Sequence, residues 1–138
     1  MALTEVDGVL AATNQWRASG ADCGQYGTMD PAPPLQGDSH LNEAAQAHAI
    51  DMGENDFFSH TGSDGSSFVD RVRRTDYSGF PMGENIAGGG AVPAGVVQRW
   101  IDSDGHCRNL MNPQATKLGV GYVADGPYGS SWVQVFGR

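Results

Sequence analysis

The chain has 138 residues, a net charge of −8, and 39% hydrophobic against 17% charged residues. This composition fits a single domain over residues 1–138 and excludes a disordered chain or two separately cored domains. The acidic balance argues against binding nucleic acid through its phosphates. The longest uncharged stretch, 85–98, is broken by glycines and a proline and is too short to span a bilayer.

Helices are predicted in the first half of the chain. Apolar residues at a spacing of three to four predict a helix over 3–16, which ends before Gly20. A second helix begins with Ser39 as its N-cap and ends near Gly53. Its inner stripe consists of Leu41, Ala44, Ala45, His48 and Met52. Ser66 or Ser67 can cap a short third helix, and we expect the nearby basic residues, Arg71, Arg73 and Arg74, on a solvated face.

Strands are concentrated in the second half. Residues 79–87 are predicted to form an irregular strand, and a helix begins at Pro93 and is stopped by Gly105. Alternation in 118–122 and 133–135 predicts a closing β-hairpin. Trp100 and Trp132 are predicted to belong to the core. Early helices and late strands indicate an α+β fold, with helices packed on an antiparallel sheet.

Three residues carry the strongest chemical signal. His60 and His106 lie at the ends of predicted elements, and Glu84 lies in a Gly-rich, apolar setting where a carboxylate needs a hydrogen bond, an ion pair or a metal. Two neutral imidazoles and one carboxylate are also the ligands of many catalytic zinc sites, although spacing alone does not show that they converge. His40 is expected to face solvent and His48 to be a core residue.

The two cysteines, Cys23 and Cys107, lie far apart in the sequence and belong to no CxxC motif. At this point a disulfide and two buried thiols remain equally open.

Five segments occur in an order that resembles the CAP superfamily of cysteine-rich secretory proteins, antigen 5 and plant pathogenesis-related proteins. They are FFSH (57–60), GENIA (83–87), WIDSDGHC (100–107), GVGY (119–122) and WVQVFG (132–137). The segment GHCRNLM (105–111) is most similar to the bacterial branch. The resemblance covers nearly the whole chain, beginning at Leu10 with Asn14 and Arg17.

This resemblance implies a three-layer α-β-α sandwich with a central antiparallel sheet. It also implies a cleft with two His and two acidic residues, which in several members bind a divalent metal. His60, Glu84 and His106 match three of these four positions. Ser103 stands where many members carry the second Glu, so a bound zinc would keep a positive charge and calcium is disfavoured.

The resemblance further favours a Cys23–Cys107 disulfide and secretion, with the signal peptide absent from this sequence. Asp64 and Gly65 are predicted to form a turn, and Asp64 is also a candidate for the rim of the cleft. The favoured function is a secreted binding module with a metal-capable cleft, with zinc as the expected cofactor, for a small hydrophobic ligand such as a lipid or sterol, or for an extracellular host protein. The alternative is a metal-dependent hydrolase, with a peptidase as the favoured form and Glu84 as a third ligand or general base. A weaker variant uses Ser103 and His106 as a nucleophile–base pair, so the sequence leaves open whether the protein is an enzyme.

Overall fold

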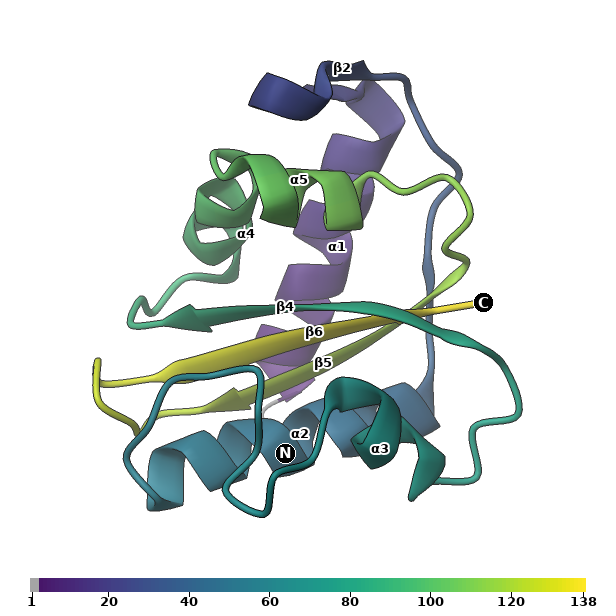
Figure 1. The fold of residues 1–138 in the computed structure, drawn as a ribbon. Helices are drawn as coiled ribbons and strands as arrows, with labels where there is room; N and C mark the ends of the chain where they lie inside the picture. Colours follow the sequence, from purple (N-terminus) through teal and green to yellow (C-terminus); the bar gives the residue numbers. More distant parts are fainter. Residues whose placement is uncertain (1–2) are drawn as a thin grey trace.

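The computed structural model describes residues 3–138 and shows a sheet between two helical layers (Figure 1). Helices α1, α4 and α5 cover one face of the sheet, and α2 and α3 cover the other. The helices are α1 (Leu3–Ser19), η1 (Gly24–Tyr26), α2 (Ser39–Glu54), α3 (Phe68–Arg73), α4 (Pro93–Ile101) and α5 (Asp104–Leu110). The strands are β1 (Ala21–Asp22), β2 (Thr28–Met29), β3 (Gln36–Gly37), β4 (Pro81–Gly88), β5 (Lys117–Val123) and β6 (Ser131–Gly137). The predicted three-layer α+β fold is confirmed.

The main sheet has the strand order β3-β5-β6-β4. The predicted hairpin is formed by β5 and β6, and β4 joins β6 antiparallel with Glu84 opposite Val135. The expectation of a purely antiparallel sheet was too simple, because β3 pairs parallel with β5 at the edge. Strands β1 and β2 form a separate antiparallel pair.

Strand β6 is buried along its whole length, since helices lie on both faces of the sheet. Successive side chains of a strand point to opposite faces. Trp132 and Phe136 therefore pack with Trp100 in the core beneath α1, α4 and α5, while Val133 and Val135 pack in the core beneath α2 and α3. The prediction that both tryptophans are core residues is confirmed.

Helix α2 lies very close to β5. A Cβ atom at Gly119 or Gly121 would collide with the α2 backbone at Leu41 or Ala45, so only glycine permits this approach. The N-cap of α2 is Asp38 and not the predicted Ser39, so the helix begins one residue earlier than predicted. Oδ1 of Asp38 accepts hydrogen bonds from two backbone amides of the first turn, at 2.9 and 3.0 Å.

A buried arginine lies near the C-terminal end of α1. The Arg17 guanidinium donates hydrogen bonds to the carbonyl oxygens of Pro33, Leu110, Asn112 and Ala115. It thereby holds the two long connections that flank β3 and β5. Within residues 3–138, no helix is both long and apolar enough to span a membrane.

Candidate functional site

Glu84 lies in the middle of β4 with both carboxylate oxygens hydrogen-bonded. Its side chain is only 1% exposed. Oε1 lies 2.8 Å from Nδ1 of His60, and Oε2 lies 2.8 Å from Nη2 of Arg71. An ionised carboxylate only accepts hydrogen bonds, so Nδ1 of His60 carries the proton and its Nε2 keeps the lone pair when the ring is neutral. Glu84 is therefore ion-paired and also orients the His60 imidazole.

Arg71 corrects the prediction of a solvated basic helix face. Arg73 and Arg74 are exposed, but Arg71 is buried and reaches Glu84 from the neighbouring helix α3. Its guanidinium also donates to the carbonyl oxygens of Ser66, at 2.8 Å, and His60, at 3.0 Å. The same side chain thus neutralises Glu84 and fixes the loop that presents His60. Ser67 caps α3 as one of the two predicted alternatives.

His106 is held from the other side of the cleft by Ser103. Ser103 is the N-cap residue of α5, and its hydroxyl lies 2.8 Å from Nδ1 of His106. Burial, and secondarily the nearby His60, lower the pKa of the His106 imidazole below its ordinary value. The ring is therefore neutral at pH 7.

The connection between α4 and α5 differs from the prediction. Helix α4 already ends at Ile101, and Gly105 lies inside α5 instead of stopping the preceding helix. Asp102 and Asp104 flank Ser103 in sequence but bond elsewhere, Asp102 to the Gln98 side chain and Asp104 to the Gln25 backbone. Neither carboxylate replaces the second family Glu.

His60, Glu84, Ser103 and His106 line one pocket of about 360 Å³. The structure thus brings together four of the five cleft residues that the sequence suggested, from a loop, a strand and the start of a helix. Sequence reasoning did not identify the other lining side chains, which are Tyr26, Arg108 and Asn109. Arg108 lies over the Tyr26 ring, at 4.7 Å from its centroid.

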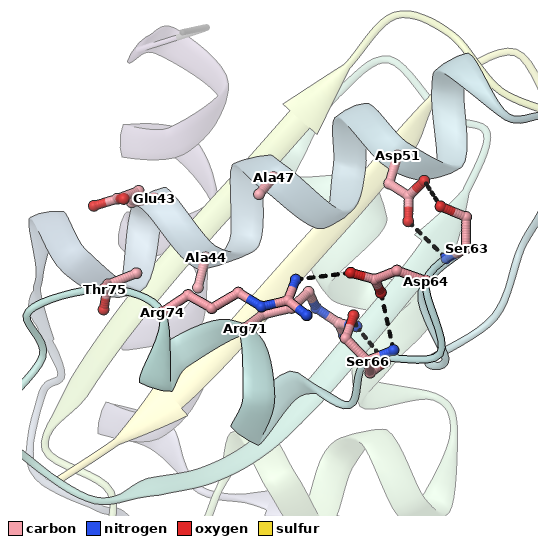
Figure 2. A pocket seen from close by; sticks show the side chains of 10 residues that line it. All are labelled: Glu43, Ala44, Ala47, Asp51, Ser63, Asp64, Ser66, Arg71, Arg74 and Thr75. Carbon is pink, nitrogen blue, oxygen red and sulfur yellow. Dashed lines mark hydrogen bonds and ion pairs between the residues drawn. The ribbon is translucent and has the colours of Figure 1, made fainter.

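Asp64 lies elsewhere, which corrects its placement at the rim of this cleft. It lines a separate cavity of about 270 Å³ between α2, α3 and the 62–66 turn (Figure 2). Hydrogen bonds from Ser66 and the ion pair with Arg74, 2.9 Å away, lower the pKa of its carboxyl. Arg71 also lines this cavity, and the same side chain is paired with Glu84 of the cleft.

The two remaining histidines lie outside the cleft. His48 is buried, as predicted, and its Nε2 lies 2.7 Å from the carbonyl oxygen of Ser59. Burial lowers the pKa of this imidazole. His40, expected to face solvent, is half-buried at the start of α2.

Few donor atoms of this cleft are free to bind a metal. Among residues 3–138, no three or more His, Cys, Asp or Glu side chains form a cluster arranged to hold a metal ion. Each Glu84 oxygen already accepts a hydrogen bond from a protein group, so the carboxylate is less available to a metal than the free ring nitrogens. The atoms left for a metal are Nε2 of His60 and Nε2 of His106, with Glu84 and Ser103 orienting the rings.

The predicted disulfide is confirmed, since Cys23 and Cys107 are bonded. Cys107 directly follows His106, and Cys23 precedes η1, which carries Tyr26. The disulfide therefore attaches one rim of the cleft to the helix that presents His106.

The three-layer sandwich, with two imidazoles and a buried carboxylate in one cleft, has the features that the sequence resemblance implied. The model of the cysteine-rich secretory protein family (CAP) matches residues 10–136. YkwD of Bacillus subtilis is 40% identical over 103 residues, which are 75% of this chain and 39% of YkwD. The chain belongs to the CAP family.

Solved structures agree with this assignment. An extracellular protein containing an SCP domain from Bacillus anthracis superposes with a TM-score of 0.79 and 31% identity, over 99% of this chain and 41% of that one. An outer surface protein from Borrelia burgdorferi gives a TM-score of 0.69 and 28% identity, over 78% of this chain and 79% of that one. This chain spans about two fifths of the length of the two Bacillus relatives.

Proposed function

We propose that this CAP domain is an extracellular binding module whose cleft binds its ligand between His60 and His106. One observation carries the proposal: each imidazole is held through Nδ1, by Glu84 or by Ser103, which leaves Nε2 of both rings for a ligand. The extracellular and surface descriptions of the similar structures support the location.

The same two nitrogens would hold a divalent transition metal, with zinc as the best match to imidazole ligands. Such an ion would supply a positive centre that binds water or an anionic group. Calcium fits poorly, because it takes six to eight oxygen ligands and the pocket offers few free ones. Within residues 3–138, the only carboxylate at this site is Glu84, and Arg71 balances its charge.

Calorimetric titration with zinc tests this proposal. The wild type is expected to bind one equivalent in the micromolar range, and His60→Ala and His106→Ala are each expected to lose the site. His40→Ala is the matched control, since His40 lies outside the cleft. NMR of the ring nitrogens provides a second measurement, because zinc should shift Nε2 of both cleft histidines. Undiminished binding by both cleft variants would refute the two-imidazole site.

The ligand that the resemblance suggests is a small hydrophobic molecule, such as a lipid or sterol, or a host protein. Saturable uptake of labelled sterol or fatty acid in a partition assay would support the lipid version. Its absence would remove that version and leave a protein or peptide ligand.

A hydrolase is the second candidate, because Ser103 and His106 lie at hydrogen-bonding distance. A serine–histidine pair needs a further group that orients the base and donors that stabilise an oxyanion. Here Nδ1, the nitrogen that such a group would hold, already contacts Ser103 itself. A metal-dependent peptidase would use Glu84 as the general base, but both Glu84 oxygens already accept hydrogen bonds, from His60 and from Arg71, whose charge balances the carboxylate. Hydrolysis of a peptide library, with and without chelator, tests both versions, and inertness in both conditions would refute them.

A further inference from the structure

A second pocket adjoins the polar cleft and shares Ser103 and His106 with it. Its volume is about 340 Å³, and three aromatic side chains, Phe58, Trp100 and Tyr128, form its walls. The two pockets together make one elongated site with an aromatic end and a polar end, joined at His106.

The aromatic end is formed by specific contacts. The Phe58 and Tyr128 rings meet edge to face with centroids 5.5 Å apart, and they remain 41% and 64% exposed. Tyr128 can lie against β4 only because position 88 is glycine, since a Cβ atom at Gly88 would collide with its ring. Arg99 donates hydrogen bonds to the carbonyl oxygens of Gly88 and Gly89, at 2.9 and 3.0 Å, and thereby fixes this end of the strand.

The charge of this elongated site is opposite to that of the protein. Of the 16 acidic residues, all of which lie within 3–138, only Glu84 lines either pocket, and Arg71 balances it. Arg99 lines the aromatic end and Arg108 the polar end. Within the described residues, neither guanidinium lies within ion-pair distance of a carboxylate. A chain with net charge −8 thus presents two uncompensated positive charges at its cleft.

We propose that this site binds a peptide segment that carries an aromatic side chain next to a carboxylate. The ring enters the pocket that Phe58, Trp100 and Tyr128 line, and the carboxylate points toward His106 and Arg108. Aromatic walls favour a ring over an alkyl chain, because edge-to-face contacts add about two- to tenfold in affinity beyond burial of area. The proposal deepens the proposed function by naming the ligand class of the same cleft.

The test is an NMR titration of the whole domain with N-acetyl-L-phenylalanine, the simplest such probe. Amide shifts are expected at Gly88, Tyr128, Ser103 and His106, with saturation. N-acetyl-L-phenylalanine amide removes the charge, N-acetyl-L-alanine removes the ring, and both should bind at least about fivefold more weakly. Octanoate keeps the charge and replaces the ring by an alkyl chain, and it too should bind more weakly.

Variants of the aromatic end complete the test. Tyr128→Ala and Gly88→Ala, which displaces Tyr128, should each weaken the probe by about two- to tenfold. Phe80→Ala is the matched control, since Phe80 is 55% exposed and lies outside both pockets. Probe binding that is unchanged in Tyr128→Ala, or octanoate binding as tight as the probe, would overturn the proposal.

Zinc titration of Tyr128→Ala separates the two proposals, because Tyr128 lines only the aromatic end. Retained zinc binding with no probe binding to the wild type would refute the peptide ligand alone. Probe binding without any zinc site would refute the metal and leave the peptide ligand standing.

Discussion

Replacement of Arg71 by methionine is predicted to destabilise the fold strongly. The methionine keeps most of the volume but removes the charge that faces Glu84. The Glu84 carboxylate is 1% exposed and would be left with His60 as its remaining hydrogen-bonding side chain. The carbonyl oxygens of Ser66 and His60 would also lose their donor.

Breaking a buried ion pair by removing one partner costs about 3–5 kcal/mol, mostly because the other charge remains buried and uncompensated. A domain of this kind has a total unfolding free energy of about 5–15 kcal/mol. The substitution therefore removes a large part of the stability and should lower Tm by about 10–15 °C.

Urea unfolding of four proteins measures the effect: the wild type, Arg71→Met, Glu84→Gln and the double variant. In the double variant neither charge of this buried pair is left, so its loss should be smaller than the sum of the single losses. We expect a coupling free energy of about 2 kcal/mol. Arg73→Met, on the exposed side of the same helix, is the control and should change stability by less than about 0.5 kcal/mol.

Two results would contradict this reasoning. A loss below about 1 kcal/mol in Arg71→Met would mean that water or a neighbouring group compensates Glu84. Additive losses in the double variant would mean that the two side chains act independently despite the distance of 2.8 Å between them.

Three further predictions follow from other parts of the fold. Burial lowers the pKa of His48 in the folded state, so as pH falls the unfolded chain binds a proton at this residue before the folded protein does. The unfolding free energy should therefore fall as pH drops below about 6.5, at up to ~1.4 kcal/mol per pH unit. His48→Gln should flatten this slope in urea titrations. Gly121→Ala should destabilise the protein by about 3 kcal/mol or more, because the new Cβ atom would meet the α2 backbone. Gly95→Ala, in open space within α4, should stabilise the protein by about 0.5–1 kcal/mol. A reversed order of the two variants in thermal melts would contradict the packing argument. Replacing Cys23 and Cys107 together by alanine should cost about 2–4 kcal/mol in chemical unfolding, and an unchanged midpoint would show that the disulfide constrains little.

The elements of the fold were predictable because their signals are local. The inner stripe of α2 repeats every three to four residues, and all five of its predicted members are buried. The hairpin of β5 and β6 follows from period-2 alternation. The parallel pairing of β3 was not predictable, because a two-residue strand carries no periodicity and depends on where β5 lies.

The site was predictable only for residue types whose chemistry requires a hydrogen-bonding or ionic partner. His60, Glu84 and His106 stood out because imidazoles and a buried carboxylate need partners. Arg71 did not stand out, because a basic residue near other basic residues on a short helix normally faces solvent. Its role depends on how α3 packs against β4, a contact between segments that no local pattern encodes. The buried position of Arg17 was not predictable from a local pattern either, since its four acceptors are backbone carbonyls of distant segments.

Arg71 and Ser103 together determine the charge of the cleft. A cleft with two carboxylates would remain negative after one of them paired with an arginine, and it would favour a cation with hard oxygen ligands. Here the single carboxylate is balanced by Arg71, and the position of the second is a neutral hydroxyl that holds His106. The net positive charge of Arg99 and Arg108 is therefore unopposed at the cleft. On the proposal of a carboxylate-bearing ligand, we therefore expect this arrangement to favour an anionic group whether or not a metal is bound between the two imidazoles.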